Sequence, residues 1–327
     1  MNLKDKAIVL GVTGGIAAYK AVALVSHLVK AGGFVDVILT DAAREFVAPL
    51  TFQALTHRPV VTEMFTLLAE TEIGHVSLAK RADLLIIAPA TANTMAKMAA
   101  GLADNMLTTT ALATEAPILI APAMESHMWA NPLTQDNAAR LGQLRDVVLV
   151  GPGEGRLASG ASGVGRMAEP EEILDAARWV LSRSGPLAGR LVVVTAGGTR
   201  EPLDPIRFLG NRSSGRMGYA LARAARDLGA RVTLISTNGQ PAPFGADLLP
   251  VETASEMCEA VLQVLPDADV LLMAAAVADY RPALQADQKI KKAEARLNLK
   301  LIRTTDVLAQ VAGRRRDDQV IVGFAAE

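Results

Sequence analysis

The chain has 327 residues, of which 50% are hydrophobic and 20% are charged, and its formal net charge is −1. This length exceeds what a single hydrophobic core usually serves, so we expect two domains. The charge lacks the basic excess of nucleic-acid-binding proteins, which argues against nucleic acid as a partner.

Neither membrane segments nor disulfides are indicated. Hydrophobic runs such as Leu84–Ala88 have the length of a strand, far below the roughly 20 apolar residues of a membrane helix. Lys4–Lys6 leads directly into the first strand and leaves no room for a signal peptide, so we expect a cytoplasmic protein. The single cysteine, Cys258, excludes an intrachain disulfide. Its place in the helical pattern of 254–265 favours a buried structural thiol over a reactive one.

In the first half of the chain, strand-like runs alternate with helical stretches. The strands are expected at Ala7–Leu10, Val35–Leu39, Leu84–Ala88, Ile118–Ala121 and Val147–Val150, and helices at Ala17–Lys30 and Glu171–Leu181. This alternation is typical of a parallel sheet that is covered on both faces. The apolar periodicity stops around Ser182–Pro186, where we place the domain boundary.

The second half repeats this scheme. A helix is expected at Gly215–Leu228, and strands at Val192–Val194, Arg231–Ser236, Val270–Ala274 and Val320–Phe324. We therefore predict an α/β protein with two doubly wound, Rossmann-like parallel-sheet domains in tandem, at residues 1–185 and 186–327. An α/β domain seldom finishes on a central strand without a covering helix, so we expect the second domain to be incomplete.

Each half begins with a strand that runs into a glycine turn and then a helix. The turns are Gly11–Gly15 and Thr195–Gly198. Glycines let backbone amides and a helix N-terminus approach a phosphate closely, which is how such sheets hold a nucleotide or a flavin phosphate. Neither turn matches a dinucleotide fingerprint or a P-loop, so a tight connection without a ligand is an equal alternative for each turn alone.

Other candidate residues of the first half follow strands or precede them. His75 precedes the third predicted strand, Asn93 follows it, and Met124, Met128 and Trp129 follow the fourth. Each has a plainer interpretation: a solvated histidine at a helix start, a helix N-cap, and the apolar face of an ordinary helix.

Four runs together resemble the flavin-containing cysteine decarboxylases in order and spacing: Gly11–Lys20, Gly74–His75, Pro89–Thr94 and Pro122–Met124. Most of residues 1–185 is similar to the decarboxylase domain of the bifunctional phosphopantothenoylcysteine decarboxylase/phosphopantothenate–cysteine ligase family. The resemblance implies FMN, with His75 as the catalytic base. The FMN-binding residues that it implies are Gly11, Thr13, Gly14, Thr40, Pro89, Ala90, Thr91 and Asn93, and the substrate-binding residues are Asn93, Met124, Glu125 and Met128.

Flavin chemistry suits this reaction. A cysteinyl carboxylate cannot simply leave as carbon dioxide, because the carbanion beside an amide nitrogen has no electron sink. Oxidation of the thiol to a thioaldehyde places a C=S bond beta to the carboxylate, so carbon dioxide departs into an enethiolate that reduced flavin returns to the thiol level. A histidine suits the accompanying proton transfer.

Glu125 departs from the family, whose commonest motif has asparagine there. An ionised carboxylate about 4 Å from the substrate carboxylate would repel it by about 4 kcal/mol at an effective dielectric of about 20. We therefore expect Glu125 to be protonated, turned away, or paired with a cation such as Arg156 or Arg166, and not to bind the substrate carboxylate itself.

Ser159 stands where the family usually has a proton-donating cysteine in a mobile loop. A serine hydroxyl is a far poorer acid than a thiol. Two possibilities follow: the final reduction is impaired, or a group other than Ser159 donates that proton.

Polar runs mark the second half. Arg207, Asn211 and Arg212 are residue types that bind phosphates and carboxylates, and they precede Ser213 and Ser214, which could cap the next helix. Small residues then lead to an acid in Ala274–Pro282, and Lys289–Lys292 follows, which by itself is usually a solvated charge run.

These runs resemble the ligase half of the same family, which activates 4'-phosphopantothenate with CTP before cysteine displaces CMP. The resemblance implies that Lys289 neutralises phosphate charge and that Arg207 and Asn211 serve the acyl cytidylate. It implies magnesium as a cofactor, with Asp279 as a ligand, and a CTP site formed by Ala274, Ala275, Ala276, Asp279, Lys289, Thr304, Thr305, Asp306, Val307 and Phe324.

Two features put the ligase activity of this chain in question. Thr304–Val307 matches the family motif only in part, and the lysine-bearing loops that follow the Phe324 motif in the family are absent. We expect a truncated ligase half on these grounds.

The combined expectation is an enzyme of coenzyme A biosynthesis. Its substrates would be 4'-phosphopantothenate, cysteine and 4'-phosphopantothenoylcysteine, and the resemblance implies a homo-oligomer of trimeric decarboxylase and dimeric ligase units. Two alternatives stay open: a flavin-binding scaffold with a degenerate site, and a different flavoenzyme, such as a peptidyl-cysteine decarboxylase or a flavin prenyltransferase. The ligase-like half disfavours the second alternative, because neither of those reactions needs CTP.

Overall fold

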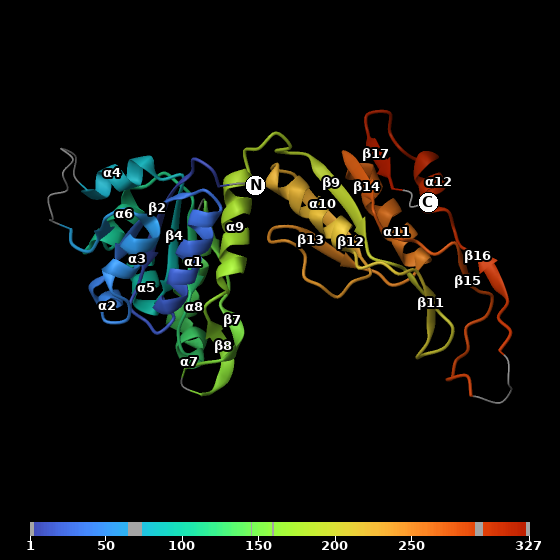
Figure 1. Cartoon of the computed structure of the whole chain (residues 1–327), viewed down its shortest axis with the longest axis horizontal. Coiled ribbons are helices and arrows are strands. Elements are labelled where there is room, and N and C mark those ends of the chain that lie inside the picture. Colours follow the sequence, from blue (N-terminus) through green and yellow to red (C-terminus); the bar gives the residue numbers. More distant parts are fainter. Residues whose placement is uncertain (1–2, 65–73, 145, 159, 292–296, 325–327) are drawn as a thin grey trace. The chain divides into compact units, whose positions relative to one another are not determined.

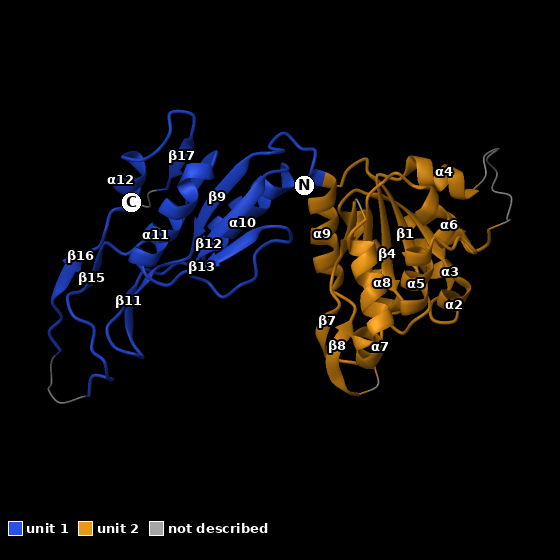
Figure 2. Cartoon of the chain, turned by 180° about the vertical axis from the view of Figure 1, so that it is seen from behind, with its two compact units in different colours: residues 1, 182–327 blue, residues 2–181 orange. Residues whose placement is uncertain are grey.

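A computed structural model describes residues 3–64, 74–144, 146–158, 160–291 and 297–324 of the chain. The chain divides into two compact units, residues 2–181 and residues 182–327, here called the N-terminal and C-terminal units (Figure 2). Within the described residues, no helix has the length and apolar character that crossing a membrane requires.

The N-terminal unit is built on a parallel sheet with helices packed around it (Figure 1). The strand order in this sheet is β3-β2-β1-β4-β5-β6. Its strands are β1 (Ala7–Val12), β2 (Phe34–Leu39), β3 (Val60–Val61), β4 (Leu84–Ala90), β5 (Ile118–Pro122) and β6 (Val147–Leu149). Its helices are α1 (Ala18–Lys30), α2 (Asp41–Arg44), α3 (Pro49–Thr56), α4 (Gly74–Arg81), α5 (Ala92–Ala100), α6 (Met106–Ala113), α7 (Ser126–Ala130), α8 (Pro132–Gly142) and α9 (Pro170–Ser182). The strand order reverses between β1 and β4, the place where such sheets bind ligands.

Alternation along the strands places one set of apolar side chains on one face of this sheet. That set meets helices α4, α5, α6 and α8 in a fully buried core. The core includes Val9, Leu85, Ile87 and Ile120 of the strands and Leu78, Met95, Leu107 and Leu141 of the helices.

An antiparallel hairpin of β7 (Gly153–Arg156) and β8 (Ser162–Arg166) follows the sheet, and β8 contacts α7. The Met124 amide donates to the Gly165 carbonyl at 2.9 Å, which joins the hairpin to the loop after β5. Gly165 has a φ of +154°, and a β-carbon there would lie 2.3 Å from the Met124 carbonyl oxygen. Only glycine allows this close approach.

The C-terminal unit has a second parallel sheet, in the order β13-β12-β9-β14-β17. These strands are β9 (Leu191–Ala196), β12 (Arg231–Ser236), β13 (Asp247–Pro250), β14 (Val270–Met273) and β17 (Val320–Gly323), and the helical elements are α10 (Arg216–Asp227), α11 (Ala254–Val264), the 3-10 turn η1 (Leu265–Asp267) and α12 (Val307–Ala312). Two antiparallel ribbons lie outside the sheet, β10 (Arg200–Pro202) with β11 (Phe208–Gly210), and β15 (Tyr280–Pro282) with β16 (Leu301–Arg303).

The two faces of this sheet have separate cores. Val192 and Val194 pack with Tyr219 of α10 on one face, whereas Val193 packs with Met257 of α11 on the other. Cys258 of α11 is 6% exposed, and burial raises the pKa of its thiol. It is a buried structural thiol, as its helical context predicts.

The observed architecture confirms the predicted fold class of two parallel α/β sheets. Each strand and helix expected from the sequence is found, with ends that shift by one or two residues. The sequence did not predict β3, β13, the β7–β8 hairpin or the two ribbons. These strands have only two to five residues, and the hairpin is rich in glycine. None of them therefore has an alternating apolar pattern long enough to predict a strand.

Candidate functional site

A cavity of about 700 Å³ lies in the N-terminal unit, at the carboxyl ends of β1, β4 and β5. Its wall is mostly apolar and includes the turn after β1, the start of α5, the loop after β5 and the β7–β8 hairpin. The residues that line it include Gly14, Gly15, Lys20, Thr91, Met124, Glu125, Met128, Arg156 and Arg166.

The turn after β1 is tied to the loop after β4 by the buried hydroxyl of Thr13. This Oγ1 donates to the Pro89 carbonyl at 2.7 Å and accepts from the Thr91 amide at 3.1 Å. Because these bonds engage the hydroxyl, Thr13 fixes the turn. The hydroxyl is therefore not free to bind a ligand, and the backbone amides next to Thr13 in the turn are the groups that can.

The two glycines of this turn have different surroundings. A β-carbon on Gly14 would lie 2.3 Å from the Ala42 Cβ and within 3 Å of the Ala42 backbone, whereas one on Gly15 would meet only the Thr91 side chain, at 3.8 Å. The first glycine is required by packing and the second borders open space. The helix that follows, α1, has neither a side-chain cap nor an acid in its first turn, so its N-terminus is available to an anion.

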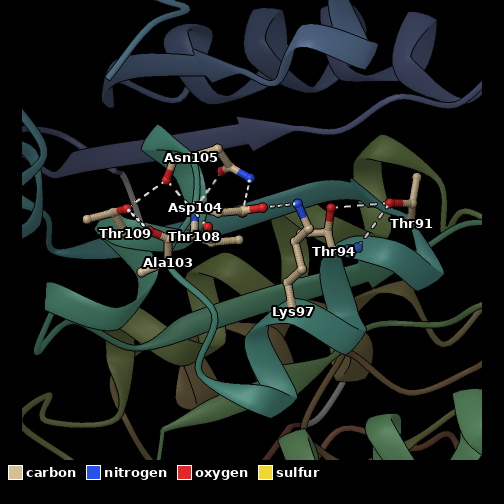
Figure 3. Close-up of polar contacts among 8 residues, drawn as sticks. All are labelled: Thr91, Thr94, Lys97, Ala103, Asp104, Asn105, Thr108 and Thr109. Atoms are coloured by element: carbon tan, nitrogen blue, oxygen red, sulfur yellow. Dashed lines mark hydrogen bonds and ion pairs between the residues drawn. The ribbon is translucent and has the colours of Figure 1, made fainter. Parts of the chain in front are cut away.

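The start of α5 is held by the Thr91 side chain, which caps it by accepting from the Thr94 amide (Figure 3). The alternative that Asn93 is the cap is therefore wrong. Lys97 at the other end of α5 pairs with Asp104 at 2.6 Å, and this hydrogen bond holds the pKa of Asp104 below its usual value. Asn93 stands in the first turn of a helix that is anchored at both ends.

Glu125 caps α7, and both of its carboxylate oxygens are engaged. Oε2 accepts from the amides of His127 at 2.7 Å and Met128 at 3.4 Å, and Oε1 accepts from the Ser126 hydroxyl at 2.8 Å and lies 3.0 Å from the His127 ring. Hydrogen bonds from Ser126 and His127 lower the pKa of Glu125 to about 2. Of the three alternatives for Glu125, protonation is therefore wrong, and the side chain pairs with the His127 ring and with neither Arg156 nor Arg166.

Two of the cations on the cavity wall share one carboxylate. Lys20 is 9% exposed, and its Nζ lies 3.0 Å from Oε1 and 3.1 Å from Oε2 of Glu169. Arg166 pairs with the same carboxylate, and the hydrogen bond from Lys20 is the largest of the effects that lower the pKa of Glu169. Lys20 and Glu169 are 149 positions apart in the sequence, so no local pattern pointed to this pair.

Several residues that the resemblance implied do not line this cavity within the described part of the chain. Pro89, Ala90 and Asn93 lie within two positions of lining residues, and Thr40 donates to the Val12 carbonyl at the end of β1. A β-carbon on Gly11 would lie 2.2 Å from the Leu107 side chain, which gives that glycine a packing role. His75 is half-buried in α4, and its Nδ1 is a buried atom with no hydrogen-bond partner among the described residues. Ser159 lies outside the described residues.

The glycine turn of the C-terminal unit packs against polar side chains. Gly197 and Gly215 have φ angles of +89° and +70°, and β-carbons there would lie 2.1 Å from the Thr237 hydroxyl and 2.3 Å from the Asn238 Nδ2. Asn238 Nδ2 donates to the Ser214 carbonyl at 2.7 Å. Gly215 is the N-cap of α10, so the interpretation of Ser213 or Ser214 as the cap is wrong.

The predicted CTP-binding loop, 274–279, lies beside this turn. The hydroxyls of Thr195 and Thr199 accept from the amides of Ala275 at 3.1 Å and Ala278 at 2.8 Å, and Asn211 Nδ2 donates to the Val277 carbonyl at 3.1 Å. The three side chains fix the loop at the carboxyl ends of β9 and β14, where the strand order reverses.

Asp204, which sequence reasoning missed, organises the loop that carries Arg207. Its buried carboxylate accepts from the amides of Ile206, Arg207 and Ile290 and pairs with the Arg207 guanidinium at 2.7 Å. Burial opposes ionisation, but these bonds outweigh it and hold the pKa of Asp204 below its usual value. Arg207 also donates to the Ile290 carbonyl, so the segment with Lys289 lies next to Arg207.

The other residues of the predicted CTP site are spread over the unit. Thr304 and Thr305 line a cavity of about 310 Å³ with Arg281 and Glu201, whereas Asp306 caps α12 and Phe324 is 46% exposed. Among the described residues there is no group of three or more potential metal-ligating side chains, so Asp279 belongs to none.

Comparison with known proteins agrees with this two-unit organisation. The Flavoprotein family profile matches residues 1–181, and the profile of the DNA/pantothenate metabolism flavoprotein C-terminal domain matches residues 187–327. The Coenzyme A biosynthesis bifunctional protein CoaBC of Bacillus subtilis is 48% identical, over 99% of this chain and 80% of that protein. The protein of the same name from Mycobacterium tuberculosis is 48% identical over 98% and 79%.

A solved structure of a PPC decarboxylase mutant complexed with pantothenoylaminoethenethiol is 32% identical, over 54% of this chain and 97% of that one, with a TM-score of 0.48. Two family profiles in tandem and relatives that match almost the whole chain lead to one assignment. The chain belongs to the family of coenzyme A biosynthesis bifunctional proteins, with a flavoprotein unit followed by a pantothenate-metabolism unit.

Proposed function

We propose that the chain carries out two consecutive steps of coenzyme A biosynthesis. The C-terminal unit joins 4'-phosphopantothenate to cysteine with CTP, and the N-terminal unit decarboxylates the resulting 4'-phosphopantothenoylcysteine to 4'-phosphopantetheine with FMN. The observation that carries the proposal is the 48% identity to a bifunctional relative over 99% of the chain. A flavin-binding scaffold is not favoured, because the similarity extends through both units.

The cavity of the N-terminal unit fits FMN. Its volume of about 700 Å³ and its largely apolar wall suit a flavin ring, and the uncapped N-terminus of α1 next to Gly14 and Gly15 suits the phosphate. Gly15 borders space that a side chain would narrow, and Thr13 and Thr91 hold this turn in place. Bound FMN would supply the two-electron acceptor that the decarboxylation requires.

The chain's own residues would position the substrate and move protons. Met124 and Met128 border the cavity and suit the uncharged part of the substrate. Among the described residues, the Nδ1 of His75 has no hydrogen-bond partner, so no such bond must break before it takes or gives a proton. His75 does not line the cavity of the single chain, so we propose that a neighbouring copy completes the site in a trimeric decarboxylase unit.

The C-terminal unit offers a loop network suited to phosphates. Arg207, held by Asp204, lies next to the segment with Lys289, and the 274–279 loop lies beside the glycine turn. Magnesium usually binds through one or two carboxylates together with substrate phosphates, so Asp279 alone fits as its protein ligand when CTP is bound. We place CTP between this loop and Lys289, in a dimeric ligase unit.

Analysis of reaction products by mass spectrometry tests both steps. The purified chain is supplied first with 4'-phosphopantothenate, cysteine and CTP, and separately with 4'-phosphopantothenoylcysteine. We expect 4'-phosphopantetheine in both reactions. Formation of only the oxidised, decarboxylated enethiol in the second would show that Ser159 is an inadequate proton donor, and no turnover in either would overturn the proposal.

A further inference from the structure

The wall of the cavity in the N-terminal unit carries one cation, Arg156, that has no charged partner among the described residues. Lys20 and Arg166 both pair with Glu169, and Lys20 also donates to the Met167 carbonyl at 3.4 Å. Arg156, at the end of β7, lines the same cavity. Within the part of the chain that the structure describes, its guanidinium has neither an ion pair nor a hydrogen bond.

The acidic group on the same wall does not compensate Arg156. Glu125 also lines the cavity, but its two oxygens accept from Ser126, His127 and Met128. A carboxylate that caps a helix in this way stays ionised, and it repels a second carboxylate brought close to it. The position that is asparagine in the commonest family motif is thus unsuited to bind the substrate carboxylate here.

We propose that Arg156 binds the carboxylate of the cysteinyl group and so selects the acid over its decarboxylated product. This inference rests on the proposed decarboxylase function and deepens it. A guanidinium presents two parallel N–H donors that match the two oxygens of a carboxylate. In the same pocket, its positive charge offsets the repulsion from Glu125.

The charge of the cavity favours the carboxylate over the phosphate of the substrate as the partner of Arg156. One guanidinium carries one positive charge and matches a monoanionic carboxylate. A phosphomonoester carries about −1.5 to −2 charges at neutral pH, which one guanidinium matches only in part. Lys20 and Arg166 share the single carboxylate of Glu169, so that cluster keeps one net positive charge.

This role has a particular kinetic signature. The carboxylate stays intact while the thiol is oxidised, so Arg156 holds it equally in the bound substrate and in the transition state of that first step. Loss of the interaction weakens substrate binding and does not slow the chemical step. We expect a change in KM with little change in kcat.

The test compares the binding of substrate and product to holoenzyme variants by calorimetry. Arg156→Ala should weaken binding of 4'-phosphopantothenoylcysteine by about 10- to 100-fold, Arg156→Lys by less, and neither should alter binding of 4'-phosphopantetheine by more than about twofold. Arg140→Ala, at an exposed position of α8, is the matched control and should bind both ligands as the wild type does. Flavin absorbance verifies that each variant retains its cofactor, and Arg156→Gln replaces Arg156→Ala if the latter does not.

Each alternative predicts a different result. Equal weakening of substrate and product would assign Arg156 to the shared phosphate, and unchanged substrate binding would exclude a contact; either overturns the proposal. Arg156→Ala should weaken the binding of pantothenoylcysteine, which lacks the phosphate, by the same factor as the binding of the phosphorylated substrate. If the variants show the expected binding pattern yet the wild type releases no carbon dioxide, the decarboxylase proposal fails while the Arg156 assignment stands.

Discussion

The two units place a glycine turn at the same point of two parallel sheets, yet the glycines serve different purposes. In the N-terminal unit, Gly14 lets the turn pack on α2, and Gly15 borders a largely apolar cavity of about 700 Å³. In the C-terminal unit, Gly197 and Gly215 make room for the side chains of Thr237 and Asn238.

This difference matches the ligands that we propose. A flavin is a large, mostly apolar group that a preformed cavity suits, whereas CTP and an acyl cytidylate carry charges that many polar groups must meet. The N-terminal site depends on shape, and the C-terminal site depends on loops that hydrogen bonds hold in place. Variants that disturb one unit and leave the other intact separate these two dependences.

The largest effect is expected from His75→Asn. General acid–base catalysis typically contributes about 10²- to 10⁴-fold, so carbon dioxide release should fall by that factor. Flavin content and the ligase reaction should not change, because the proposed role of His75 is proton transfer and the residue lies outside the C-terminal unit. Carbon dioxide release near the wild-type rate would show that His75 is not the base.

Asp204→Ala should slow the ligase reaction and leave decarboxylation unchanged, the reverse of His75→Asn. Without this carboxylate, Arg207 and the segment with Lys289 lose their common anchor, and misplacement of such groups by about 1 Å can cost on the order of 100-fold in rate. CMP release should fall by about that factor while decarboxylation is unchanged. Asp247→Asn, at an exposed position of β13, is the control that should retain both rates.

Gly14→Ala and Gly15→Ala test the shape of the cavity with the same added methyl group. The first forces the turn away from Ala42. Such overpacking typically costs about 1–3 kcal/mol, which corresponds to about 5- to 150-fold weaker FMN binding if the full cost falls on the bound state. The second makes only an ordinary contact and should keep its affinity within a few-fold. Titration of the apoprotein with FMN measures both, and equal affinities would contradict the packing argument.

Glu125→Gln should have the smallest effect, a decrease of a few degrees in Tm at neutral pH, because it removes the charge that caps α7. The pKa of Glu125 in the folded chain is about 2, below the ordinary value of 4.5. The ionised group therefore stabilises the fold fully above about pH 4.5 and loses this effect as the pH falls toward 2. Melting curves over this range should show the Tm difference between variant and wild type closing, and a constant difference would argue against an ionised cap.

Long, strongly patterned segments could be predicted from the sequence. The β-branched strand Val192–Val194 and the amphipathic helix around Gly215–Leu228 are specified by local alternation and periodicity, and they are present. That Thr13 and Gly14 after β1 lie at the same edge of the sheet as Thr91 after β4 also follows from the rule that ligands meet the carboxyl ends of parallel strands.

Contacts between distant parts of the sequence could not be predicted in this way. The Lys20–Glu169 pair joins residues 149 positions apart, and the bonds from Ile290 and Arg207 to Asp204 join two loops. Glu125 illustrates a further limit. Its residue type indicated a carboxylate that repels the substrate carboxylate, whereas in the structure it caps helix α7. Such roles depend on backbone geometry that residue identity alone does not specify.

The central claim is that the N-terminal cavity binds FMN for decarboxylation of a cysteinyl substrate. The most direct measurement is the flavin released from the purified chain, quantified against protein, together with the carbon dioxide formed from 4'-phosphopantothenoylcysteine. We predict about one FMN per chain, uptake of added FMN by the apoprotein, and release of carbon dioxide. A colourless protein that neither takes up FMN nor releases carbon dioxide would contradict it.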